Sequence, residues 1–100
     1  MDIKKINIRL KSYANSVADL VCQKNADYDK AFEKSFRKFG WATYFIRIGD
    51  KLNRLEALTL NNQVNTVKDE NIEDTLTDII GYSLLLLEIL KRKGEENNND

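Results

Sequence analysis

Apolar residues recur along the chain at steps of three and four, which is the spacing of an amphipathic α-helix. The first such series is Ile3, Ile6, Leu10, Tyr13, Val17 and Leu20. A second, shorter series is Phe32, Phe36 and Phe39, and a third is Trp41, Phe45, Ile48, Leu52 and Leu55. The fourth is Ile72, Leu76, Ile79, Ser83, Leu86 and Leu90. These four patterns predict an all-α fold, a small antiparallel bundle of about four helices.

The predicted helix ends follow from the few residues that interrupt these patterns. The chain has no proline and only four glycines. The polar run over residues 24–29 predicts the first turn, and Gly40 predicts an αL end to the second helix. The third helix is expected to run from about Trp41 to Leu58 or Leu60, before a polar loop over residues 61–68.

The fourth helix is expected to begin at a cap formed by Asp69 or Asn71 and to end at Gly94. We therefore predict a single helical domain over residues 1–93 and a disordered tail over residues 94–100. The fourth helix is apolar around most of its circumference, with Leu84, Leu85 and Leu87 beside its inward stripe. An all-round apolar helix needs further cover, so a homo-oligomer is expected.

Composition excludes several kinds of function. Sixteen basic and sixteen acidic residues cancel, so no general attraction to a nucleic-acid polymer or an anionic membrane is expected. Cys22 is the only cysteine, which favours a cytoplasmic protein with a small buried thiol at this position. The absence of histidine excludes Ser-His-Asp and Cys-His catalysis and leaves Mg²⁺ as the metal to consider. The longest apolar run, residues 79–90, is too short to span a bilayer and contains Glu88.

Two charged helix faces are the best candidates for a site. Arg47, Asp50, Lys51 and Arg54 fall on one face of the third helix, and Asp74, Asp78 and Tyr82 on one face of the fourth. Such faces can meet in a groove that suits a phosphorylated ligand, since arginine binds phosphate oxygens in pairs. Solvated faces with local ion pairs are the alternative. Asp78 stands between apolar neighbours, where a charge needs a partner.

The aromatic residues divide into two groups. Tyr28, Tyr44 and Tyr82 carry hydroxyls and can offer a ring to a nucleotide base, so they are candidate ligand contacts. Phe36, Phe39, Trp41 and Phe45 are assigned to the core.

Four motifs occur in a characteristic order along the chain: residues 24–28, Lys-Asn-Ala-Asp-Tyr; Phe32 with Phe39-Gly40; residues 47–55; and residues 69–78. Over about residues 20–90 they resemble the nucleotide-modification-associated domain family of phages and bacteria, which is more remotely similar to all-α nucleotide pyrophosphohydrolases of the MazG kind. The resemblance implies a helical, oligomeric, nucleotide-handling protein. It adds Lys24, Asn25, Asp27 and Tyr28 to the candidate ligand-binding residues.

Two departures from these families bear on the reaction. The family commonly has Tyr-Gly-x-Ser-Phe where this chain has Tyr28-Asp-Lys-Ala-Phe32. MazG-like enzymes hold magnesium with a Glu-Glu-x-x-Glu helix and a second acidic pair, whereas Asp50 here stands among basic residues. The metal cage is therefore incomplete, which favours binding over hydrolysis.

Three hypotheses follow. In the first, the protein captures a phosphorylated nucleotide, for instance a cyclic dinucleotide signal of bacterial defence sequestered by a phage protein. In the second, it is a Mg²⁺-dependent nucleoside triphosphate pyrophosphohydrolase, with Asp74 and Asp78 as metal ligands beside Asp50 and Glu73. In the third, it is a helical protein-interaction module that has no nucleotide affinity.

Overall fold

The fold was analysed in a computed structural model that describes residues 2–27, 30–60 and 68–98. For residues 25–27, 68–70 and 96–98 it describes the helical backbone only. The described chain forms four helices, α1 (Ile3–Asp27), α2 (Ala31–Phe39), α3 (Trp41–Thr59) and α4 (Lys68–Asn98), and no strand. The predicted all-α class is confirmed.

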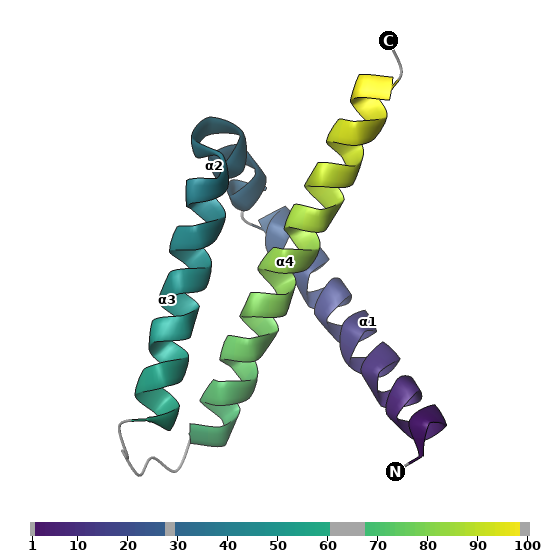
Figure 1. Ribbon diagram of the computed structural model, residues 1–100, viewed down its shortest axis with the longest axis vertical. Coiled ribbons are helices and arrows are strands. Elements are labelled where there is room, and N and C mark those ends of the chain that lie inside the picture. The colour runs from purple at the N-terminus through teal and green to yellow at the C-terminus, as the bar shows by residue number, and fades with distance from the viewer. Residues whose placement is uncertain (1, 28–29, 61–67, 99–100) are drawn as a thin grey trace.

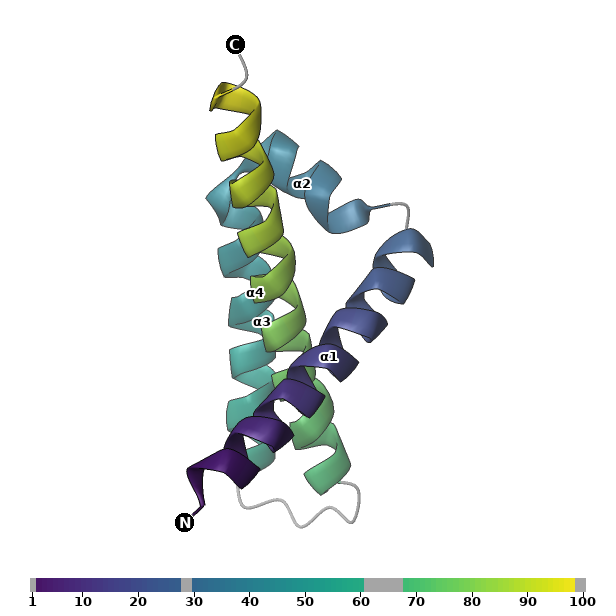
Figure 2. The ribbon, with the colours of Figure 1, turned by 90° about the vertical axis from the view of Figure 1, so that its right-hand side faces the viewer.

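Two long helices make the frame of the molecule. Helices α3 and α4 run antiparallel beside each other, while the C-terminal half of α1 and the short α2 lie behind them (Figure 1). A view turned by 90° shows α1 crossing α4 at an angle, with α2 joining the far end of α1 to the start of α3 (Figure 2). Helix α1 thus packs mainly against α4.

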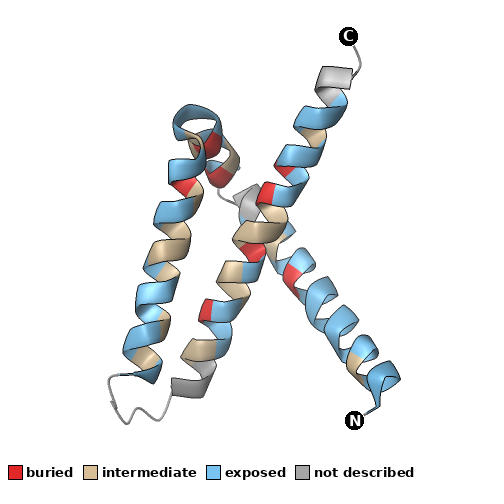
Figure 3. Cartoon of the chain, viewed as in Figure 1, coloured by how far each residue is buried: buried red, intermediate tan, exposed pale blue. Residues whose placement is uncertain are grey.

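The core lies where α2 meets the middle of α4 (Figure 3). Phe32 and Phe36 of α2 are buried against Leu86 and Ile89 of α4, and three partly buried side chains pack around them: Tyr44, Tyr82 and Leu85. The buried threonines satisfy their hydroxyls on the backbone. Thr43 donates to the Ser35 carbonyl at 3.0 Å, and Thr75 donates to that of Asn71 at 2.7 Å.

Helix α1 reaches α4 at a glycine. A Cβ atom on Gly81 would lie 2.8 Å from Cγ2 of Val21, which is shorter than any ordinary carbon–carbon contact. Gly81 and nearby Val17 are both buried. The missing side chain therefore permits the close crossing of the two helices.

A charge cluster ties α2 to α4. The guanidinium of Arg92 contacts the Glu33 carboxylate and also binds Glu88 through Nε at 2.6 Å, while Arg37 lies 3.5 Å from Glu33. The hydrogen bond from Arg92 lowers the pKa of the Glu33 carboxyl below its usual 4.5, and the two glutamates raise the pKa of Arg92.

Several predicted helix ends are wrong. Helix α1 continues to Asp27, through four of the six residues of the predicted turn. Gly40 ends α2 as predicted and has a positive φ of 68°, but its ψ of −145° lies outside the predicted αL region. Helix α4 begins at Lys68, so Asp69 and Asn71 lie inside the helix.

Gly94 does not end α4, which continues to Asn98. One glycine costs a helix only about 1 kcal/mol relative to alanine, which does not suffice to stop it. The disordered tail predicted from residue 94 is therefore not supported over residues 94–98, and residues 99–100 lie outside the described chain. The single-domain boundary at residue 93 stays a prediction.

The inward face of α3 also differs from the prediction. Of the four aromatic residues assigned to the core only Phe36 is buried, and Phe39, Trp41 and Phe45 are exposed. Helix α3 instead turns Thr43, Tyr44 and Arg47 toward its neighbours.

Helix α1 is less buried than its sequence pattern predicted. Most of its apolar seam is exposed, with Val17 the one buried member, and the Cys22 thiol is exposed rather than buried. No described helix combines the length and the apolar character that a membrane span needs.

Candidate functional site

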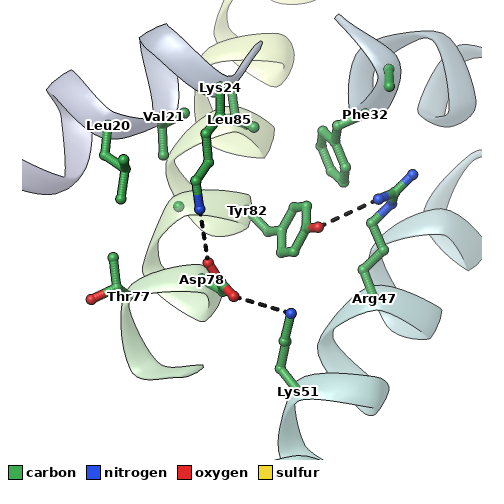
Figure 4. A pocket seen from close by; sticks show the side chains of 12 residues that line it. Leu20, Val21, Lys24, Phe32, Arg47, Lys51, Thr77, Asp78, Tyr82 and Leu85 are labelled. Carbon is green, nitrogen blue, oxygen red and sulfur yellow. Dashed lines mark hydrogen bonds and ion pairs between the residues drawn. The ribbon is translucent and has the colours of Figure 1, made fainter. Parts of the chain in front are cut away.

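A cavity of about 410 Å³ opens where all four helices approach one another (Figure 4). Its lining combines an apolar part with a charged part, and each helix contributes to it. The lining residues are Leu20, Val21, Lys24, Ala31, Phe32, Arg47, Lys51, Thr77, Asp78, Gly81, Tyr82 and Leu85.

The apolar part of the cavity is built around two aromatic rings. Phe32 of α2 and Tyr82 of α4 have ring centroids 5.4 Å apart and planes inclined by 41°. Leu20 and Val21 of α1 and Leu85 of α4 extend this surface. Phe32 is buried and Tyr82 is half-buried, so the core of the fold holds both rings in place.

The charged part is centred on Asp78. Its carboxylate lies 3.0 Å from the Lys51 ammonium of α3 and 3.7 Å from the Lys24 ammonium of α1. Figure 4 shows the two lysines reaching Asp78 from different helices. Because both lysine side chains and Asp78 remain partly exposed, these ion pairs can exchange with water or with an incoming anion.

Arg47 lies beside the two aromatic rings (Figure 4). Its Nη1 donates to the Tyr82 hydroxyl at 3.4 Å, and its guanidinium carbon lies 5.9 Å from the Phe32 ring centroid and 5.5 Å from that of Tyr82. Such cation–π contacts orient a guanidinium without neutralising it. Among the described residues, the lining therefore carries three cations, Lys24, Arg47 and Lys51, and one carboxylate, Asp78.

Five of the candidate residues from the sequence meet in this cavity: Lys24, Arg47, Lys51, Asp78 and Tyr82. Tyr44 does not line it. Its hydroxyl is 2.8 Å from Ser83 Oγ, and its ring packs against the core. The side chains of Asn25, Asp27 and Tyr28 lie outside the described residues.

Asp50 and Arg54 are separate from the cavity. Asp50 is exposed and lines a shallower hollow of about 300 Å³, shared with Ser35, Phe39, Thr43, Ile46 and Arg47. Arg54 is exposed and lines neither hollow. The basic face of α3 is thus divided, and Arg47 and Lys51 form its pocket-facing part.

The proposed metal ligands do not gather around one point. Asp74 and Glu73 are exposed on α4 outside the cavity, while Asp78 is paired with two lysines. Among the described residues, no three side chains of the acidic, histidine or cysteine type lie close enough to form a metal-binding group.

Some lining residues were missed from the sequence. Phe32 was identified as a motif residue but not as part of the site, and Leu20, Val21 and Leu85 look like ordinary core positions. Gly81 carried no distinguishing signal in the sequence, because Gly49 and Gly94 also lie inside helices and a Cβ atom on either would have no neighbour within 4 Å.

The comparisons with known proteins identify the family of the chain. No curated protein and no solved structure matches the chain. The family model described as nucleotide modification associated domain 1 matches residues 24–89, about two thirds of the chain. The match begins at Lys24 and includes every charged residue that lines the cavity. The chain belongs to the nucleotide modification associated domain 1 family.

Proposed function

We propose that the protein binds a phosphorylated nucleoside in the cavity between its four helices. The observation that carries this proposal is the presence, in one cavity, of two aromatic rings, the Arg47 guanidinium beside them, and two lysines paired with Asp78. The cavity volume is within the range of small-molecule sites, roughly 300–1,000 Å³. Membership of a family whose description refers to nucleotides supports the same class of ligand.

The charged part fits the phosphate end of such a ligand. Among the described lining residues, Lys24, Arg47 and Lys51 exceed Asp78 by two positive charges, which favours anions although the whole chain is neutral. In the free protein Asp78 keeps the two ammonium groups near the cavity. A phosphate replaces Asp78 as their partner and takes the planar donors of Arg47 as well.

The aromatic part fits the base. Tyr82 is half-buried with its hydroxyl on Arg47, and Phe32 backs it from α2. Stacking on such rings contributes about 1–3 kcal/mol per base in nucleic-acid systems and tolerates different bases.

We propose capture of the ligand rather than its hydrolysis. A magnesium-dependent reaction at this cavity requires Asp78 to leave both lysines and coordinate a cation beside three positive charges, which is electrostatically unfavourable. Capture is compatible with the sequestration of a nucleotide signal, linear or cyclic, by a cytoplasmic protein of phage origin. A homo-oligomer belongs to the same proposal, since α3 and α4 expose apolar side chains.

The test is retention of intact ligand. Purified protein is incubated with mono-, tri- and cyclic nucleotides, with and without Mg²⁺, washed by filtration and denatured, and the released compounds are identified by mass spectrometry. We expect intact nucleotide in near-equal amount to protein, with or without the metal. Pyrophosphate or monophosphate in excess of protein identifies a hydrolase, and the absence of both ligand and product supports the interaction module.

Matched variants assign the ligand to the cavity. Lys51→Met removes a cavity ammonium and should weaken retention about tenfold or more, since hydrogen bonds to charged groups contribute about 1.5–3 kcal/mol. Lys11→Met makes the same chemical change at an exposed position of α1 and should leave retention unchanged. Equal effects of the two substitutions contradict binding in the cavity.

A further inference from the structure

Helix α3 exposes an apolar stripe that the described chain does not cover. Trp41, Phe45 and Leu52 follow one another at steps of four and seven, so they lie on one side of the helix. Each is about half exposed or more. The Trp41 ring packs edge-on against Tyr44 at 6.2 Å, which places the stripe beside the contact between α3 and α4.

Helix α4 exposes a matching stripe. Leu76, Ile80, Leu87 and Leu90 follow at steps of four, seven and three, the spacing of a coiled-coil seam. Ser83 occupies the missing position between Ile80 and Leu87, and its hydroxyl contacts Tyr44 of α3. The two stripes therefore adjoin along the contact of α3 with α4 and form one surface, called here the hairpin face.

The hairpin face points away from α1 and from the cavity. On α3, Arg47 and Lys51 line the cavity and lie about a third of a turn from the stripe. On α4, Gly81 faces Val21 of α1 and lies more than a third of a turn from the stripe. Figures 1 and 2 show that the C-terminal half of α1 and α2 lie on one side of α3 and α4, while the N-terminal half of α1 passes beside α4 toward the other side and leaves α3 uncovered there.

The accessible surface of the chain is larger than that of a typical folded monomer of the same mass. The chain has an accessible surface of 7973 Å², whereas a folded monomer of 11.6 kDa exposes about 5,800 Å². Its radius of gyration of 16.2 Å also exceeds the roughly 13 Å of a compact domain of this length. The excess of about 2,000 Å² is more than the roughly 800 Å² that each partner hides in a standard interface.

We infer that a second copy of this chain covers the hairpin face, so that two α3–α4 hairpins form a four-helix bundle. The surface is self-complementary in chemistry, because both of its stripes are apolar and carry the seam spacing of bundle helices. The net charge of zero imposes no repulsion between copies. This inference names the surface behind the proposed homo-oligomer and does not depend on nucleotide binding.

Charge fixes the relative direction of the two hairpins. Exposed Glu56 of α3 and Glu73 of α4 lie toward the end near residues 60–68, and exposed Lys91 of α4 lies toward the other end. An antiparallel arrangement about a two-fold axis places the acidic end of one copy against the basic end of the other. Both cavities then open on the outside of the dimer, giving two independent sites.

The first test measures mass and its dependence on the hairpin face. Light scattering on the purified chain at micromolar concentration should give twice 11.6 kDa. Phe45→Asp or Leu87→Asp should give a monomer, since each buries a carboxylate in an apolar interface. Ile8→Asp is the matched control, because Ile8 is 67% exposed on α1, against 66% for Phe45 and 64% for Leu87, and this variant should remain a dimer.

A monomeric wild type, or an assembly that both hairpin-face substitutions leave intact, overturns the inference. If an Asp variant fails to fold, Phe45→Ala replaces it. Sedimentation should then show a dissociation constant raised about tenfold or more, as expected for an aromatic anchor. An unchanged constant also overturns the inference.

A second test concerns direction. In a Cys22→Ser background, a spin label on Leu60→Cys reports the distance between equivalent ends of the two hairpins. Helix α3 has 19 residues, so the antiparallel arrangement separates the labels by roughly 30 Å. A short separation contradicts the antiparallel arrangement. Nucleotide retention by the monomeric Asp variants is measured separately, so that failure of the interface and failure of ligand binding are distinguished.

Discussion

Replacing Gly81 by alanine tests the closest approach in the structure. The new Cβ would lie 2.8 Å from Cγ2 of Val21, about 0.7–1.2 Å inside the preferred carbon–carbon separation of 3.5–4.0 Å. Val21 has little freedom to move aside, because a β-branched side chain in a helix has one strongly preferred χ1 rotamer. The clash must therefore shift α1 relative to α4.

The expected magnitude is the balance of two terms. Overpacking of this kind costs about 1–3 kcal/mol, while glycine to alanine inside a helix contributes about 1 kcal/mol of stability. Gly49→Ala in α3 and Gly94→Ala in α4 are controls for the second term, because neither new Cβ has a contact within 4 Å. We expect Gly81→Ala to be less stable than the Gly49→Ala control by about 1–3 kcal/mol.

The assay is thermal and urea denaturation followed by the helical circular dichroism signal, at one fixed protein concentration because an oligomer makes stability concentration-dependent. The difference corresponds to roughly 4–8 °C of melting temperature per kcal/mol in a domain of this size. Val21→Ala removes the opposing methyl groups, so Gly81→Ala in that background should recover the gain of the control. If Gly81→Ala alone stabilises as much as Gly49→Ala, helix α1 does not pack on α4 at this glycine.

Three further expectations concern charge. Asp78→Asn removes both ion pairs in the cavity and should lower the free energy of unfolding by no more than about 1–2 kcal/mol, because all three side chains are partly exposed. The same substitution should strengthen triphosphate binding measured by calorimetry. Weaker binding by a folded Asp78→Asn protein would show that this carboxylate contacts the ligand. Because the pKa of the Glu33 carboxyl is lowered, its contribution to stability is present above pH 4.5 and is lost as the pH falls through the lowered pKa. Stability of the Glu33→Gln protein should therefore fall less steeply with pH below 4.5 than that of the wild type. Parallel acid denaturation curves for the two proteins contradict this. Triphosphate affinity should fall as salt rises in titrations, since the contacts are partly exposed charges; an unchanged affinity would argue against phosphate in the charged part.

Helix existence could be predicted from the sequence, but the burial of individual faces could not. The three-and-four spacing located all four helices, because it reflects backbone geometry alone. The same spacing put Trp41 and Phe45 in the core of the chain, although they are exposed. An apolar stripe indicates that something covers it and does not identify the cover.

The charged half of the site was more predictable than its aromatic half. Arg47 and Lys51 are one turn apart on the same helix, and Asp78 stood out as a carboxylate among apolar residues, so local patterns sufficed. Phe32 and Val21 reach the cavity only because α2 and α1 cross α4 at particular angles. Those angles depend on long-range packing, such as the contact at Gly81, which no local pattern specifies.

The position of α1 has a consequence for how the protein is made. Its principal packing partner, α4, leaves the ribosome after α2 and α3, whereas α3 and α4 are neighbours in sequence. Local contacts form early and long-range closure comes late, so the hairpin of α3 and α4 should assemble before α1 docks on it. Lys24 meets Asp78 only after that docking. A nascent chain therefore acquires its ligand site in the final step of folding, and any change that delays the docking of α1 leaves a helical protein with an unfinished cavity.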